Sequence, residues 1–332
     1  MLALDLGGTQ IRAATVDGRG EVRHARRSRT PVEDGRAAIV AACIAAVQRV
    51  RADHDADPGA APLDGIGISA PGPVDPRAGV TLDPPNLGPT FRDTPLAALV
   101  GEALELPTFL DRDTQVAALA ERRFGAAAGC DDFLYVTVST GIGGAIVTGG
   151  RLVRGPDGTA GELGHLLVDL HGPPCGCGMP GHLEGIASGS GIARAARAAA
   201  ERGESELLGE LVLAHGPAFG AREVVQAEEA GDPVAARIMA YARDAFAASC
   251  VSLADVFNPS LVVVGGSLAV GQGERLLGPA RAAIALGAFR RQAERVRIVP
   301  AALGDDVGLV GALVLVGERL GEAGRAGAAA PG

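Results

Sequence analysis

GELGHLLVDLHGPPCGCGMPGHLE, residues 161–184, is the stretch around which the rest of the chain is organised. It concentrates cysteines, histidines and glutamates in a segment otherwise rich in Gly, Pro and small apolar residues. Four of its side chains supply the donors of a closed, tetrahedral zinc site: His165, Cys175, Cys177 and His182. The sequence therefore predicts a structural zinc loop, with His171 as a substitute ligand. The alternative is an ordinary loop of Gly, Pro and His, because Cys-x-Cys is not the usual zinc-finger spacing.

Two glutamates, Glu162 and Glu184, flank the predicted ligands. Carboxylates held rigidly beside a metal-braced loop are suited to binding the hydroxyls of a sugar. The alternative is that both are solvated surface acids.

Length and composition limit the class of protein. The chain has 332 residues, which is enough for two domains with substantial cores, and 47% of them are hydrophobic. No apolar run reaches membrane-spanning length, and the first residues carry no basic leader, so we expect a soluble cytoplasmic protein without a membrane partner. The net charge of −9 argues against non-specific binding of nucleic acid. The cysteines outside the loop are expected to be reduced core residues.

Lysine is absent, so all 30 cationic side chains are arginines. A Walker A phosphate loop and Schiff-base chemistry both require lysine and are therefore excluded. If the protein binds a nucleotide, then backbone amides, hydroxyls, arginine and Mg²⁺ must hold the phosphates.

A glycine-rich turn interrupts the first strands. Residues 2–6, 10–16 and 21–25 are predicted to form three antiparallel strands, and Gly7, Gly8 and Thr9 lie in the first turn. Successive amides in such a turn can bind phosphate oxygens, and Asp5 can reach a hydrated Mg²⁺. A plain hairpin turn is the alternative.

The same hairpin design occurs once more, and a third glycine pair follows a later strand. Strands at 133–138 and 145–147 enclose a turn with hydroxyls and paired glycines, and a buried strand at 261–264 ends in a third glycine pair. These segments supply the following candidate nucleotide-binding residues: Thr137, Thr140, Gly141, Gly143, Gly144, Gly265 and Gly266. Two phosphate-holding hairpins, one in each half of the chain, would clamp a nucleotide between two lobes. Tight turns without a ligand are the alternative.

Asp113 follows a predicted strand at 106–110 and precedes a predicted helix at 115–121. It is either the N-cap of that helix or a catalytic base at the carboxyl end of a strand, where ligand sites of α/β folds lie. Further helices are predicted at 34–53, 94–103, 190–202, 221–229, 232–257 and 306–320, with strands at 65–70 and 295–299. Gly65 and Gly67 match the start of the dinucleotide-binding fingerprint. Pro71 and Pro73 stand where its phosphate-binding helix would begin, so we reject this motif.

Taken together, these motifs resemble the ROK family of sugar kinases and repressors, over the whole chain to about residue 320. The resemblance rests on the first hairpin, on Gly65 to Asp75, on Pro85-Asn86-Leu87, on Thr137 to Gly144, on Asn258 to Gly266, and most specifically on residues 161–184. The family has three cysteines in its zinc loop, and His182 replaces the third.

The resemblance implies an α/β, two-lobe actin-like ATPase (ribonuclease H-like) fold with a zinc-stapled loop in the second lobe. Residues 1–112 would form the N-terminal lobe, completed by a helix at about 307–320. Residues 113–306 would form the C-terminal lobe, and residues 321–332 a disordered tail.

The resemblance also implies roles for individual residues. Asp113 would be the general base on the sugar hydroxyl, while Asn86, Glu162, His165 and Glu184 would bind the sugar. Arg112 stands where the family usually has an asparagine that touches the sugar, so it joins the predicted substrate contacts and leaves the identity of the sugar open. Gln10, Ser139, Ala145 and Ser267 are further departures that remove no catalytic group.

The predicted activity is phosphorylation of a hexose by ATP and Mg²⁺, with glucose and its 6-hydroxyl as the default acceptor. Alternatives are a kinase for N-acetylmannosamine, an amino sugar or a cyclitol, polyphosphate as the donor, and a sugar-binding protein with impaired catalysis. A repressor would need a DNA-binding module ahead of Asp5, where four residues stand. A homodimer or homotetramer is expected from the family.

Overall fold

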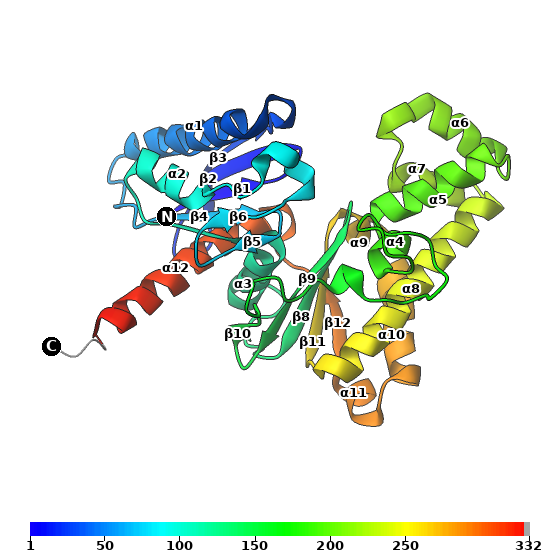
Figure 1. Ribbon diagram of the computed structural model, residues 1–332. Coiled ribbons are helices and arrows are strands. Elements are labelled where there is room, and N and C mark those ends of the chain that lie inside the picture. Colours follow the sequence, from blue (N-terminus) through cyan, green and yellow to red (C-terminus); the bar gives the residue numbers. More distant parts are fainter. Residues whose placement is uncertain (329–332) are drawn as a thin grey trace. The chain divides into compact units, whose positions relative to one another are not determined.

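The computed structural model describes residues 1–328, with side chains described through Glu322 (Figure 1). The chain divides into two compact units. Unit 1 comprises residues 1–129, residues 152–160 and the described residues from Ala302 onward. Unit 2 comprises residues 130–151 and 161–301.

A five-stranded mixed sheet forms the centre of unit 1. Its strands, in spatial order, are β3 (Val22–Arg29), β2 (Gln10–Val16), β1 (Leu2–Leu6), β4 (Ile66–Ala70) and β7 (Thr108–Arg112). The first three are antiparallel, whereas β1, β4 and β7 run parallel. The predicted opening hairpin is therefore present, and two parallel strands extend it.

Successive side chains of β1 point to opposite faces of this sheet. Leu2 and Leu4 belong to the core that α1 (Gly35–Asp55) and α2 (Leu96–Leu104) cover, whereas Ala3 packs with residues of α12 (Val307–Ala328) on the opposite face. Gly67 allows α12 to approach closely, because a Cβ at this position would lie 2.2 Å from the carbonyl oxygen of Ala312. Short elements complete the unit: β5 (Val74–Asp75), β6 (Val80–Thr81) and 3-10 turns at Val32–Asp34, Pro85–Leu87, Pro89–Phe91 and Gly304–Asp306.

Helix α3 (Asp113–Phe124) belongs to unit 1, so the division falls after this helix and not at the predicted boundary of residues 112 and 113. The physical reason is its packing against α12, where Val116 and Leu119 share a small core with Leu315. Glu121 also joins α3 to the segment that precedes α12, because its fully buried carboxylate accepts hydrogen bonds from the amides of Ala302 and Leu303.

Unit 2 repeats the sheet design. The strands of this sheet, in spatial order, are β10 (Arg151–Leu152, of which Leu152 is counted with unit 1), β9 (Ile142–Thr148), β8 (Phe133–Val138), β11 (Leu261–Gly265) and β12 (Arg297–Pro300). Strand β8 is antiparallel to β9 and parallel to β11, which is parallel to β12. The second predicted hairpin is therefore also present.

Helices of unit 2 follow clear local signals. Helix α8 (Pro233–Phe257) starts with proline after Asp232, whose carboxylate accepts hydrogen bonds from two free amides, and it ends at Asn258 in the left-handed conformation. The other helices are α4 (Leu183–Ala187), α5 (Gly189–Glu201), α6 (Glu206–His215), α7 (Ala221–Glu229), α9 (Ser267–Gln272), α10 (Glu274–Gly287) and α11 (Arg290–Arg295).

Helix α12 extends to Ala328, past its predicted end near Leu320. The alanines, glutamate and arginine of this segment favour helix and outweigh its glycines, which had suggested disorder for 321–332. The remainder of that predicted tail, 329–332, lies outside the described residues. Within the described chain, no helix combines the length and apolarity that a membrane crossing requires.

Candidate functional site

The first glycine turn of unit 1 lies against the predicted sugar loop. The turn is held by a hydrogen bond from the amide of Gly7 to the carbonyl of Gln10, and by one from Thr30 Oγ1 to the carbonyl of Gly7. A Cβ at Gly8 would lie 2.8 Å from the Cβ of Asn86, so only glycine lets these two segments meet. The structure thus brings the predicted phosphate turn and the predicted sugar residue together.

Asp5 lies beneath this turn. Ser69 Oγ donates a hydrogen bond of 2.8 Å to its carboxylate, and a Cβ at Gly308, at the start of α12, would lie 2.7 Å from its Cγ. Burial raises the pKa of the Asp5 carboxyl, and the Ser69 hydroxyl and the Arg12 charge oppose that rise. A carboxylate in such a place is a suitable oxygen ligand for a partly hydrated Mg²⁺, whose charge would offset the cost of burial.

The junction of β7 and α3 presents Asp113 to solvent. Arg112 occupies the N-cap position, and Asp113 is the first helical residue, with Oδ1 2.7 Å from the amide of Thr114. The N-cap alternative therefore does not describe this aspartate. Its place at the carboxyl end of a parallel strand is the one expected of a catalytic base in an α/β fold.

Arg112 is turned inward at this junction. Its side chain is buried, and one of its terminal nitrogens donates a hydrogen bond of 2.9 Å to the carbonyl of Ala160. Its aliphatic part crosses Gly72, where a Cβ would lie 2.6 Å from Arg112 Cδ. The structure therefore shows Arg112 in contact with neighbouring loops, and direct contact with a sugar stays a prediction.

The second glycine turn, in unit 2, adjoins the predicted adenosine segment. The Ser139 hydroxyl lies 2.9 Å from that of Ser267, and a Cβ at Gly266 would lie 2.7 Å from Thr137 Oγ1. Gly266 has φ +92°, which favours glycine, so the segment can turn sharply beside β8. The carbonyls of Ser139 and Thr140 also accept the first free amides of α5.

A cavity of about 830 Å³ lies in unit 2 at this turn. Its lining includes Ser139, Thr140 and Ser267 together with Arg197, Phe219 and Gln272. Sequence reasoning did not identify the last three, because nothing distinguishes their segments from ordinary surface helices and loops. Arg197 lies over the ring of Phe219, 5.0 Å from its centroid.

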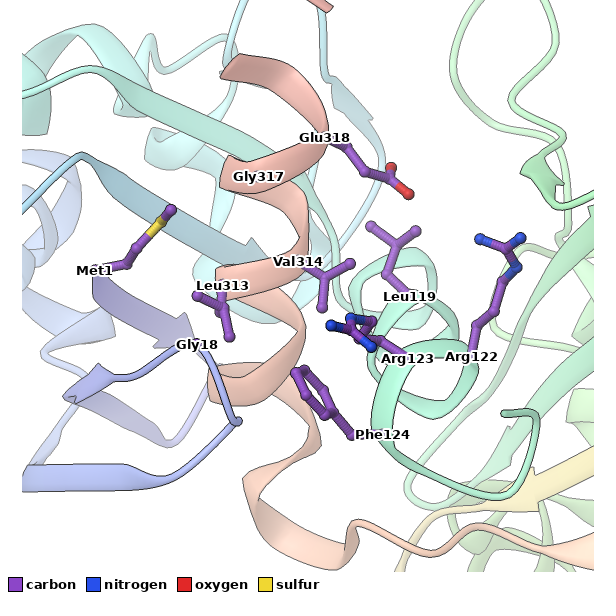
Figure 2. A pocket seen from close by; sticks show the side chains of 10 residues that line it. All are labelled: Met1, Gly18, Leu119, Arg122, Arg123, Phe124, Leu313, Val314, Gly317 and Glu318. Carbon is purple, nitrogen blue, oxygen red and sulfur yellow. The ribbon is translucent and has the colours of Figure 1, made fainter. Parts of the chain in front are cut away.

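A smaller cavity of about 380 Å³ lies in unit 1, between α3 and α12 (Figure 2). Leu119, Phe124, Leu313 and Val314 form its apolar lining, and Glu318 points into it from α12. Burial raises the pKa of the Glu318 carboxyl. None of the predicted site residues lines this cavity.

The four predicted zinc ligands come together in unit 2. One donor atom from each of His165, Cys175, Cys177 and His182 lies within 4.8 Å of the others. Cys177 Sγ is 3.3 Å from His182 Nδ1, and burial raises the pKa of the Cys175 thiol. Two sulfurs and two imidazole nitrogens at these separations fit a tetrahedral Zn²⁺. His171 is not part of this group.

The predicted sugar-binding acids of unit 2 lie beside the cysteine and histidine cluster. Glu162 Oε2 is 3.7 Å from His165 Nδ1. Glu184 Oε2 accepts a hydrogen bond of 2.9 Å from the amide of Ile142, while its Oε1 lies 3.6 Å from Cys175 Sγ. Glu184 therefore connects the second glycine hairpin to the candidate metal loop.

Asp169 anchors the middle of this loop to α8. It accepts a hydrogen bond from the Tyr241 hydroxyl and another, of 2.9 Å, from the amide of His171. Burial and the neighbouring carboxylate raise the pKa of Tyr241 to about 12. No local sequence signal indicated this pair.

Comparisons with known proteins agree with these features. The sequence profile of the ROK family matches residues 1–319. A glucokinase of Halalkalibacterium halodurans is 33% identical over 320 residues, which are 96% of this chain and 95% of that protein. An N-acetylmannosamine kinase of Escherichia coli O157:H7 is 34% identical over 321 residues, which cover 96% of this chain and 99% of that protein.

A solved structure is similar over nearly the same length. The ROK family glucokinase of Streptomyces griseus, in complex with glucose and AMPPNP, has 33% sequence identity and a TM-score of 0.76, with 94% of this chain and 97% of that chain covered. The fold, its two glycine hairpins and the whole-length matches lead to one conclusion: the chain belongs to the ROK family.

Proposed function

We propose that the chain, a sugar kinase of the ROK family, transfers the γ-phosphoryl group of ATP to the 6-hydroxyl of a hexose, with glucose as the first candidate. The observation that carries the proposal is Asp113, an exposed carboxylate at the carboxyl end of β7 in a chain that resembles a glucokinase solved with glucose and AMPPNP. Phosphoryl transfer requires positioned reactants and stabilised charge more than covalent help from the protein.

Unit 1 would supply the catalytic base, part of the sugar-binding site and part of the nucleotide-binding site. Asp113 would accept the proton of the attacking hydroxyl, and Asn86 would hydrogen bond another hydroxyl of the sugar. The amides of Gly7, Gly8 and Thr9 would bind phosphate oxygens. Mg²⁺ would be held through Asp5 and would neutralise charge on the transferred group.

Unit 2 would supply the remaining nucleotide contacts. Thr137, Thr140 and the glycines of the second hairpin would bind phosphate oxygens through hydroxyls and amides, a solution available to a chain without lysine. Gly265 and Gly266, beside the cavity of about 830 Å³, would accommodate the nucleoside.

Glu162, His165 and Glu184 would bind sugar hydroxyls from unit 2. His165, Cys175, Cys177 and His182 would hold Zn²⁺ as a structural ion, which would fix the orientation and tautomer of His165. Removal of the ion would therefore weaken sugar binding as well as stability.

The test is ADP release by the purified protein with a panel of sugars. We expect turnover with glucose in the presence of ATP and Mg²⁺. N-acetylmannosamine belongs in the panel because kinases for that sugar are as similar to this chain as the glucokinases are. Amino sugars and a cyclitol extend the range of acceptors, and polyphosphate replaces ATP as the donor in a parallel series. Absence of turnover with every pair of donor and acceptor would refute the proposal. Light scattering coupled to gel filtration tests the proposed homodimer or homotetramer.

A further inference from the structure

Helix α9 supplies part of the wall of the cavity of about 830 Å³ in unit 2. The helix begins at Ser267, whose hydroxyl lies beside that of Ser139 in the second glycine turn, and it ends at Gln272. The five residues from Ser267 to Gln272 correspond to a rise of about 7.5 Å along the helix. Gln272 therefore lines the cavity away from the turn proposed to bind phosphate, where room is left for a nucleoside.

The side-chain amide of Gln272 has a fixed orientation. Its Oε1 accepts hydrogen bonds of 3.0 and 2.7 Å from Nε and Nη2 of Arg243. A guanidinium group only donates hydrogen bonds, so the amide oxygen must face Arg243 and the amide nitrogen must face away from it. Gln272 is only 5% exposed, and in the described part of the chain no group accepts a hydrogen bond from its Nε2.

Arg243 is itself held in place by Glu228. Its Nη1 and Nη2 donate hydrogen bonds of 2.8 and 2.7 Å to the two carboxylate oxygens of Glu228, and Arg275 forms an ion pair of 2.6 Å with the same carboxylate. Burial opposes the charge of Glu228, but the two arginines outweigh it and lower the pKa of the Glu228 carboxyl. A two-pronged contact of this kind fixes the plane of the guanidinium group. Arg243 therefore holds the Gln272 oxygen in one direction.

The lining of the cavity leaves the Gln272 donor available to a ligand. Glu223 carries the only carboxylate of the described lining, and its oxygens already accept hydrogen bonds from the amide of Gly220 at 2.7 Å and from Arg222 Nε at 3.1 Å. Phe219 and Leu268 add apolar surface on which a flat ring can pack. A buried donor beside apolar walls is suited to a heterocycle that carries an acceptor atom.

We infer that Gln272 recognises the base of the nucleotide: its Nε2 donates a hydrogen bond to a ring nitrogen of the purine. Glu228 and Arg243 are positioning residues that hold the amide in this orientation. The inference rests on the part of the proposed function that places the nucleoside in this cavity. Adenine offers ring nitrogens 1, 3 and 7 as acceptors, so a fixed donor can bind one of them without any charge on the base.

The test is calorimetric titration of ADP into the wild-type protein, Gln272→Glu and Gln272→Met. Glutamate has the same length and keeps an oxygen for Arg243, but it presents an acceptor to the base in place of the donor. Methionine gives up both contacts. We expect Gln272→Glu to weaken ADP binding about tenfold or more, and Gln272→Met to weaken it less. A residue that only braced Arg243 would give the opposite order, because glutamate keeps that contact and methionine loses it.

Deaza analogues of ADP test the contact with the base directly. The 1-, 3- and 7-deaza compounds each replace one ring nitrogen by a C–H group. One of the three should bind the wild-type protein more weakly than ADP does, and Gln272→Met should then cause no further loss for that analogue.

The matched control is Gln226→Glu, the same substitution at an exposed glutamine of α7 that does not line the described cavity. It should leave the affinity for ADP unchanged. Thermal unfolding of each variant checks that it is folded.

Unchanged ADP affinity in Gln272→Glu would overturn the inference, and so would a larger loss in Gln272→Met than in Gln272→Glu. Further loss on Gln272→Met with all three deaza analogues would overturn it as well. By contrast, a wild-type protein that binds ADP in the expected pattern but phosphorylates no sugar would refute the proposed function and leave the role of Gln272 intact.

Discussion

Replacement of Asp113 by asparagine distinguishes a catalytic base from a residue that only starts a helix. Asp113 is the first residue of α3, and its Oδ1 accepts the hydrogen bond of the Thr114 amide at 2.7 Å. Asparagine keeps an oxygen that can accept the hydrogen bond of the Thr114 amide, but the variant loses the interaction of a negative charge with the helix N-terminus. That interaction contributes about 0.3–1 kcal/mol.

The kinetic effect should be much larger. General base catalysis contributes about 10²- to 10⁴-fold to a rate, which corresponds to about 2.7–5.4 kcal/mol of activation free energy. The amide of asparagine cannot accept the proton of the sugar hydroxyl. We therefore expect kcat to fall by two to four orders of magnitude, while the affinity for glucose changes little.

Three measurements separate these effects: ADP release, calorimetric titration with glucose and urea unfolding. Asp34→Asn is the matched control, because Asp34 is an exposed aspartate immediately before α1 and makes no side-chain capping bond. It should alter stability by a similar small amount and leave kcat unchanged. A kcat of Asp113→Asn within about threefold of wild type would refute the reasoning and leave Asp113 with a structural role only.

Two further predictions concern unit 2, and a third concerns Glu121, the buried glutamate of α3. His182→Ala should lose bound zinc and melt at a lower temperature, whereas His171→Ala should keep its zinc; metal analysis showing the reverse would exchange their roles. Tyr241→Phe should be less stable than the wild-type protein at neutral pH, because the variant lacks the Tyr241 hydroxyl, whose hydrogen bond lowers the pKa of the Asp169 carboxyl. That loss should fade as the pH falls below the ordinary Asp value of 3.8, where Asp169 becomes protonated, and as it rises from 10 towards the Tyr241 pKa of about 12; an equal loss at every pH would contradict this account. Glu121→Gln should lower the free energy of unfolding by about 1–3 kcal/mol, because an amide nitrogen replaces an oxygen that accepts a backbone hydrogen bond; unchanged urea unfolding would show that the interaction is dispensable.

The sequence predicted the features whose signals are local. Both glycine hairpins were identified because their turn residues separate short apolar strands, and the structure has them at β1–β2 and β8–β9. The cysteine and histidine cluster was identified because its four members lie within eighteen residues, and the structure brings their donor atoms together.

Features that depend on distant contacts could not be predicted in this way. Arg112 and Ala160 are 48 residues apart, Asp169 and Tyr241 are 72 apart, and Glu121 and Ala302 are 181 apart. The placement of α3 in unit 1 has the same origin, since its partner α12 lies near the end of the chain. Hydrophobic periodicity located the helix but carried no information about which surface it would cover.

The late position of α12 has a consequence for biosynthesis. Ala3 and Ala14, at the very start of the chain, pack against Leu309 and Ala312. The ribosome therefore releases the first strands long before α12 is synthesised. Until then, one apolar face of the N-terminal sheet is exposed to solvent. Unit 2 has its whole sequence by Ala301, so we expect the middle of the polypeptide to mature first and the beginning to mature last.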